Sequence, residues 1–137
     1  MKHINLPRPL VNRILTLAQS SPDREICGLV SAQPDQALRC IPVSNVAEQS
    51  ERLFTMDPAQ QIEVMRQMRE RDESLFAIYH SHPTGPAEPS STDIEQAGYP
   101  EVLHLIVSLN TKGVLELKGY QFDCGKAAAV HLEILED

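Results

Sequence analysis

The chain has 137 residues, a length that suits one domain with a single hydrophobic core of its own. Its net charge is −7, and its 12 lysine and arginine residues are scattered along the sequence, so we expect no nucleic-acid partner. The apolar runs are too short for a signal peptide or a membrane span, so we expect a cytoplasmic protein without a membrane partner. The three cysteines lie far apart, which indicates reduced thiols.

The first half of the chain alternates helical and extended patterns. Apolar residues with helical spacing follow a proline and predict a helix over 9–19. The segments 25–32 and 37–44 are separated by a turn-like stretch, which predicts a β-hairpin. The pair Asp57-Pro58 is typical of an N-cap and first helical residue, so a second helix should continue from there to about residue 73.

The second half begins with a strand predicted at 74–82. Alternation along this strand would place four residues on one face, namely Phe76, Ile78, His80 and His82. A further helix should begin near Ser91, and three more strands are predicted at 103–109, 113–122 and 128–135. Helices interleaved with hairpins predict an α/β or α+β layer architecture, a mixed sheet with helices packed on it, in a single domain over 1–137.

The stretch 80–93, HSHPTGPAEPSSTD, combines two histidines with hydroxyl and carboxylate side chains. His80 and His82 are i and i+2 on a strand, so both imidazoles can reach one ion. Pro83 and the prolines and glycine that follow stop the strand and turn the chain back. Asp93 could then approach the same ion from the next helix. Two histidines and one carboxylate leave a fourth position for water, as in catalytic zinc sites.

The same residues also permit a purely structural interpretation. Ser90-x-x-Asp93 resembles a capping box with Asp in place of Glu, and Thr92-x-x-Glu95 matches the capping pattern better. Local propensity favours the cap. Since the start of a helix can also hold a metal ligand in place, the two interpretations are compatible, and the residues alone leave both open.

The spacing H-x-H-P, six residues, Ser, two residues, Asp resembles the signature of the JAMM metallopeptidases, the metal-binding MPN domains. Five residues of this chain fill it without a gap or substitution: His80, His82, Pro83, Ser90 and Asp93. The family also carries a glutamate before a short apolar-Gly sequence on an early strand, and REICGLV supplies Glu25 and Gly28 there. The segments PVSNVA, LFTMDPAQQ and HLIVSL further resemble the small prokaryotic members.

The resemblance implies an MPN/JAMM fold with cytidine-deaminase-like layering and a zinc ion held by His80, His82 and Asp93. A zinc ion in such a site lowers the pKa of its water towards about 7 and thereby supplies the nucleophile for amide hydrolysis. In the family role, Glu25 takes a proton from that water and gives it to the leaving amine, and Ser90 donates a hydrogen bond to the tetrahedral intermediate.

Without the resemblance, the choice of proton shuttle is open among nineteen acids. Proximity in sequence would favour Glu88 or Glu95, although neither position is compelled. Cys27 is expected to be a buried small hydrophobe on the same strand face as Glu25, and a cysteine nucleophile would lack a free base. His104, in an apolar strand, is expected to be a core histidine.

Members of this family remove ubiquitin, ubiquitin-like proteins or residues attached to the C-terminus of small sulfur carriers. The resemblance therefore implies a zinc-dependent peptidase or isopeptidase that hydrolyses the bond after the C-terminal Gly or Gly-Gly of a ubiquitin-like or sulfur-carrier protein, whose tail is the partner. The alternatives are a non-catalytic MPN-type scaffold module and a zinc peptidase with other peptide substrates. A zinc deaminase is set aside because P-C-x-x-C and H-x-E are absent.

Overall fold

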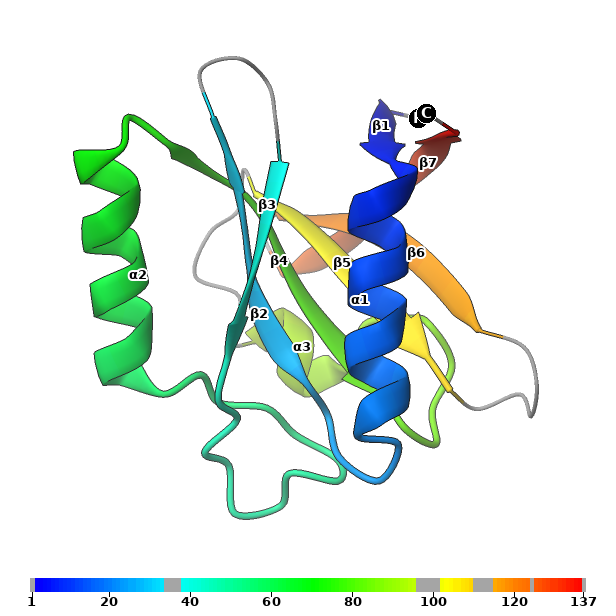
Figure 1. Ribbon diagram of the computed structural model, residues 1–137. Helices are drawn as coiled ribbons and strands as arrows, with labels where there is room; N and C mark the ends of the chain where they lie inside the picture. The colour runs from blue at the N-terminus through cyan, green and yellow to red at the C-terminus, as the bar shows by residue number, and fades with distance from the viewer. Residues whose placement is uncertain (1, 34–37, 96–101, 110–114, 124, 137) are drawn as a thin grey trace.

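A computed structural model describes residues 2–33, 38–95, 102–109, 115–123 and 125–136 (Figure 1). The elements in these residues are, in chain order, β1 (Lys2–Pro7), α1 (Arg8–Ser20), β2 (Cys27–Ala32), β3 (Leu38–Val43), α2 (Pro58–Glu70), β4 (Ser74–His82), α3 (Ser91–Glu95), β5 (Leu103–Ser108), β6 (Glu116–Asp123) and β7 (Lys126–Leu135). Within this part of the chain, no helix is long and apolar enough to cross a membrane.

The strands form one mixed sheet in the order β1-β7-β6-β5-β4-β2-β3. β1 pairs with β7 and β4 pairs with β5 in parallel, whereas the other neighbours are antiparallel. The pairing of β2 with β4 ends where Cys27 faces His80. The residues just before β2 therefore lie beside the histidine-bearing end of β4.

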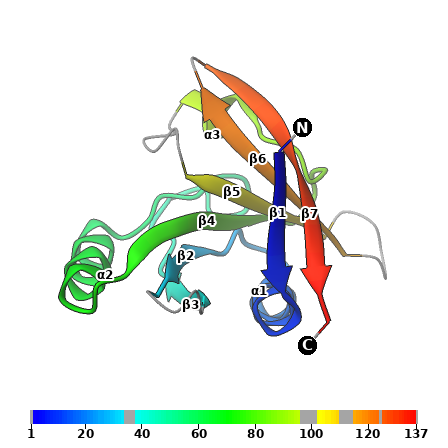
Figure 2. The same ribbon diagram turned by 90° about the horizontal axis from the view of Figure 1, so that it is seen from above.

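Helices cover both faces of this sheet (Figure 2). On one face, Ile14 and the other buried residues of α1 pack in one cluster with Tyr79 of β4 and neighbouring strands. On the other face, Met68 of α2 packs with Ile78 of β4, and Ile94 of α3 packs against a cluster of β5 and β6. Because successive strand residues point to opposite faces, Ile78 and Tyr79 belong to different halves of the core.

Most of the predicted elements are confirmed, with three differences. The second helix ends at Glu70, three residues earlier than predicted, and Asp72 beyond it has a left-handed backbone with φ 55°, a conformation that Asp tolerates better than most residues. β1 was not predicted; it pairs with β7 at the far end of the chain. The prediction that Phe76 shares a face with the histidines is wrong. The β2–β4 register skips it, and Phe76 packs with the α1 side of the core.

Gly28 lies at a point of close approach between β2, β3 and β4. A Cβ atom there would be 2.2 Å from the hydroxyl of Tyr79 and 2.5 Å from the carbonyl oxygen of Ile41. Tyr79 is fully buried, so its ring has no space into which to retreat. The glycine of REICGLV is therefore needed for packing, and a side chain at this position would displace the strands that flank the histidines.

Glu73, between α2 and β4, is a buried acid whose side chain is 1% exposed. Its carboxylate accepts hydrogen bonds from Arg39 at 2.7 Å and Gln33 at 3.1 Å. The hydrogen bond from Arg39 outweighs the effect of burial and lowers the pKa of Glu73 to about 2. This ion pair joins β3 to the loop after α2.

Glu73→Gln is expected to lower the free energy of unfolding by about 2 kcal/mol at pH 7, because it removes one partner of a buried charged pair. The folded-state pKa of Glu73 lies below the unfolded value of about 4.3, so its stabilisation is complete above pH 4.3 and is lost as the pH falls towards 2. Urea unfolding at pH 7 and at pH 3 should show the gap between variant and wild type narrowing in acid. Glu63→Gln, at an exposed pair with Arg66, is the control and should change stability far less.

Candidate metal centre

Two histidines lie next to each other at the end of β4. His80 is 1% exposed and His82 is 7% exposed, and their Nε2 atoms are 3.1 Å apart. Asp93, in the first turn of α3, places Oδ2 3.1 Å from Nε2 of His80 and 3.2 Å from Nε2 of His82. The structure therefore brings together the three side chains that were predicted as metal ligands.

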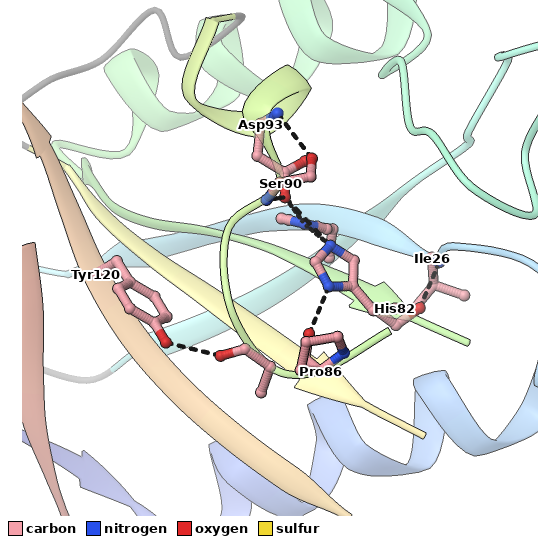
Figure 3. A network of polar contacts seen from close by, with 9 residues as sticks. Ile26, His82, Pro86, Ser90, Asp93 and Tyr120 are labelled. Carbon is pink, nitrogen blue, oxygen red and sulfur yellow. Dashed lines mark hydrogen bonds and ion pairs between the residues drawn. The ribbon is translucent and has the colours of Figure 1, made fainter. Parts of the chain in front are cut away.

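The tautomer of His82 is fixed by the loop that follows it. Its Nδ1 lies 2.8 Å from the carbonyl oxygen of Pro86 (Figure 3), and a carbonyl oxygen can only accept. Nδ1 therefore carries the hydrogen and donates a hydrogen bond to the carbonyl oxygen of Pro86. Nε2 is left with its lone pair directed towards His80 and Asp93, which is the arrangement that metal-binding histidines adopt.

The loop between β4 and α3 is also fixed on either side of Pro86. Ser108 of β5 donates a hydrogen bond of 2.7 Å to the carbonyl of Gly85. The hydroxyl of Tyr120 on β6 donates one of 2.8 Å to the carbonyl of Ala87 (Figure 3). Both donors come from the sheet. The proline-rich loop is thus held against β5 and β6, and this fixes the position from which α3 begins.

Ser90 and Asp93 form a reciprocal pair at the start of α3. The backbone N–H of Ser90 donates to Oδ2 of Asp93 at 2.9 Å, and the backbone N–H of Asp93 donates to Oγ of Ser90 at 3.0 Å. The predicted capping interaction is therefore present, and it orients the same carboxylate that faces the histidines. Although burial opposes ionisation, the close contacts with the rings of His80 and His82 hold the pKa of Asp93 well below its usual range.

His80 is enclosed more tightly than His82. Its ring stacks on Phe54 with a centroid distance of 4.4 Å and an interplanar angle of 22°. Burial lowers the pKa of His80, with Asp93 acting in the opposite direction. Within the described residues its Nδ1 atom has no hydrogen-bond partner. His80 is therefore a neutral imidazole whose orientation depends on packing against Phe54 and on the contacts of Nε2.

Glu25 lies two residues before β2 and is 4% exposed. One carboxylate oxygen lies within 4.8 Å of ring nitrogens of both His80 and His82. Among the residues that the structure describes, Oε1 of Glu25 is buried without a hydrogen-bond partner. Burial raises the pKa of Glu25 to about 7, against the opposing effect of His82 and with a further increase from Asp93. The carboxyl group is thus able to gain or lose a proton near neutral pH.

This donor set fits a divalent cation. The ionised carboxylate of Asp93 can only accept, and in the neutral imidazole of His82 that donates from Nδ1, the Nε2 atom also accepts. Bonds of about 2.0–2.1 Å that meet at the tetrahedral angle separate ligand atoms by about 3.3 Å, which is close to the observed 3.1–3.2 Å. Two imidazole nitrogens and one carboxylate oxygen are ligands that zinc accepts, with one position left open.

Two carboxylates are near enough to complete the histidine pair. Asp93 is in direct contact with both imidazoles, whereas the atoms of the group formed by Glu25, His80 and His82 are only within 4.8 Å of one another. The distances favour Asp93 as the ligand. Glu25 is farther from the point where the three ligand atoms converge, at a distance that one water molecule can bridge. Its carboxyl group can therefore exchange a proton with such a water.

A cavity of about 260 Å³ opens beside this cluster. Glu25, His82 and Ser90 line one part of it, and Arg52 lines the part formed by the loop between β3 and α2. A peptide that enters it would have its backbone close to both Glu25 and Ser90.

The other candidates from the sequence have no part in the cluster. Cys27 is buried, its thiol donates to the carbonyl of Val43, and burial raises its pKa to about 12, so it is no nucleophile at neutral pH. His104 is buried and stacks on Phe122 at 4.2 Å. The two other acids considered as proton shuttles also lie outside the cluster. Glu95 is exposed on α3, and Glu88 lines the cavity wall.

Sequence reasoning missed the residues that hold the cluster in place. Pro86 acts through its carbonyl, which every residue type has, so its identity gave no signal. Phe54 lies in an irregular stretch without periodicity, and its contact with His80 depends on how that stretch folds back. Asn45 and Ser81 bond to the backbone around Glu25, and residue type alone does not reveal such long-range partners.

Known proteins resemble this chain over most of its length. Residues 7–118 match the family described as prokaryotic homologs of the JAB domain. The chain belongs to this family. A curated relative from Mycobacterium tuberculosis, named CysO-cysteine peptidase, is 32% identical over 129 residues, or 93% of this chain and 88% of the relative. A second relative, named desampylase, from Haloferax volcanii, is 31% identical over 93 residues, or 66% of this chain and 67% of the relative.

Two solved structures share the fold of this JAB-domain protein. The solution structure of a Desulfitobacterium hafniense protein is 27% identical with a TM-score of 0.84, and the match covers 97% of this chain and 93% of the other. The crystal structure of a JAB1/MPN domain protein from Archaeoglobus fulgidus is 24% identical with a TM-score of 0.62, covering 99% and 100%. The predicted family and its α/β fold, a mixed sheet with helices packed on it, are confirmed.

Proposed function

We propose that residues 1–137 form one zinc metallopeptidase domain in which His80, His82 and Asp93 hold the ion. The observation that carries this proposal is the triangle formed by Nε2 of His80, Nε2 of His82 and Oδ2 of Asp93, with edges of 3.1–3.2 Å, which lies beside the buried carboxyl group of Glu25. Atoms this close to one another share either a proton or a metal cation, and their convergence on one point suits a cation. Zinc suits two imidazoles and one carboxylate with an open fourth position.

The bound ion would supply an activated water for attack on an amide carbonyl. Glu25 faces that position, and its carboxyl group takes the proton from the water and returns it to the leaving amine. Ser90 accepts a hydrogen bond from Asp93 through its oxygen, so its own hydroxyl proton is available to the developing oxyanion. The cavity beside Glu25 and Ser90 receives the scissile segment.

The substrate is the C-terminal tail of a ubiquitin-like or sulfur-carrier protein, cut after its terminal Gly or Gly-Gly. One relative is named CysO-cysteine peptidase, and the cavity beside the cluster is lined by both Glu25 and Ser90. A cytoplasmic setting agrees with Cys27 and Cys40, which are free thiols in the structure.

The test uses a small carrier protein ending in Gly-Gly that bears either one extra C-terminal residue or a lysine side chain joined through an isopeptide bond. The zinc-loaded enzyme is expected to cleave at least one adduct after the last glycine, as shown by the mass of the trimmed carrier. A chelator should abolish turnover, and zinc, unlike magnesium, should restore it.

A carrier whose terminal Gly-Gly is replaced by Ala-Ala is the matched control, and it should be cut far more slowly. Stoichiometric zinc without turnover of any adduct would contradict the peptidase proposal and favour a scaffold module. Cleavage of unrelated peptides at the same rate would instead indicate a zinc peptidase with other substrates.

A further inference from the structure

The backbone of Glu25 is held by hydrogen bonds although Glu25 lies outside β2. Its N–H donates to the carbonyl of Ser50 at 2.7 Å, and its carbonyl accepts from Nδ2 of Asn45 at 2.9 Å. Both partners belong to the loop between β3 and α2. One side of the Glu25 peptide is therefore fixed to the loop that also carries Phe54 onto His80.

The other side of this segment is fixed by Ser81, which lies between the two histidines on β4 and is fully buried. Oγ of Ser81 accepts from the backbone N–H of Ile26 at 2.9 Å and donates to the carbonyl of Arg24 at 3.5 Å. The backbone N–H of Ser81 donates to the carbonyl of Ile26 at 3.1 Å. The hydroxyl thus bonds to the residues on both sides of Glu25.

These contacts replace the regular ladder between β2 and β4. A hydrogen-bonded antiparallel pair exchanges two N–H to carbonyl bonds, and Ser81 and Ile26 make one of them. For the second bond, the N–H of Ile26 uses Oγ of Ser81 as its acceptor. The hydroxyl therefore sits between the two strands where the ladder ends, and it sets the separation between the Glu25 segment and β4.

We propose that Ser81 is a positioning residue for Glu25, tying the backbone of the proton shuttle to the strand that carries His80 and His82. This inference rests on the proposed function, in which Glu25 moves the proton. The side chains of His80 and His82 alternate with that of Ser81 along β4, so one strand directs the histidines to the cluster and the serine to the Glu25 segment. Three consecutive residues of β4, His80, Ser81 and His82, therefore set the distance between the carboxyl group of Glu25 and the metal-binding cluster.

A hydroxyl deletion tests this proposal because a shift of about 1 Å in a catalytic group costs about 100-fold in rate. Ser81→Ala is expected to lower kcat about 10-fold to 100-fold, with KM changed less than about 2-fold and zinc stoichiometry unchanged. Ser81→Thr keeps the hydroxyl and should recover most of kcat. Ser31→Ala is the matched control, because Ser31 is also fully buried but lies towards the far end of β2.

Hydrogen exchange gives a readout that is independent of activity. In the metal-free protein, peptides that contain residues 24–27 should exchange faster in Ser81→Ala than in wild type and Ser81→Thr, because the amide of Ile26 loses its acceptor. Equal exchange in wild type and Ser81→Ala would show that the hydroxyl does not hold this segment, and that result overturns the inference even if no adduct is cleaved.

A double-mutant cycle with Glu25→Gln separates positioning from general destabilisation. If Ser81 acts through Glu25, adding Ser81→Ala to Glu25→Gln should cause no further loss of kcat. A full multiplicative loss in the double variant would overturn the inference while leaving the proposed function intact. If Glu25→Gln alone retained full activity, the proposed function would fail instead, so the two failures are distinguishable.

Discussion

Glu25→Gln is expected to lower kcat by about 10³-fold to 10⁴-fold while the protein still binds one zinc ion. The amide has the shape of the carboxyl group but cannot take a proton from water or return it to an amine, and general acid–base groups contribute rate factors of about 10²–10⁴. We expect a loss in the upper part of that range because Glu25 takes the proton from the water and also returns it to the leaving amine. Single-turnover cleavage of the carrier adduct and zinc content after gel filtration measure the two quantities.

Glu95→Gln is the control for this variant. Glu95 is one of the two acids, with Glu88, that proximity to the motif suggested, but it is exposed on α3. Its replacement should leave kcat within about 2-fold of wild type, since surface charges outside the site contribute little. A normal rate in Glu25→Gln combined with a large loss in Glu95→Gln would reverse the assignment of the shuttle.

The sequence allowed the cluster to be anticipated because its signal is local. His80 and His82 are separated by one residue, and Asp93 follows within one short loop, so strand geometry and a helix start already bring them near one ion. Glu25 was accessible only through the family resemblance. The sequence places it 55 residues before His80, and its proximity depends on the pairing of β2 with β4.

The features that were missed depend on tertiary contacts. β1 is short, ends in a proline and pairs with β7, which lies more than a hundred residues away in the sequence. No local pattern therefore predicts it as a strand. The irregularity at Phe76 changes which face that side chain occupies, and alternation alone cannot anticipate it. The carbonyl of Pro86 orients His82 without any residue-specific signal.

Asp93→Asn is expected to weaken zinc affinity by more than about 100-fold, because even groups outside the first coordination shell contribute 10-fold to 100-fold. The amide keeps the size of the side chain and can still accept at the start of α3, so the helix cap should survive. It loses the negative charge that faces both histidines at 3.1 Å and 3.2 Å. Competition with a chromophoric chelator measures the affinity, and the melting temperature of the metal-free protein reports on the fold.

The two substitutions together decide which carboxylate holds the metal, since Glu25 and Asp93 both face the histidine pair. If Asp93 is the ligand and Glu25 the proton shuttle, Asp93→Asn loses zinc and activity together, and excess zinc restores part of the activity. Glu25→Gln keeps zinc, and no amount of zinc restores its activity. The opposite pattern, with zinc lost from Glu25→Gln and kept in Asp93→Asn, would make Glu25 the third ligand and leave the protein without the proton shuttle that its peptidase chemistry requires.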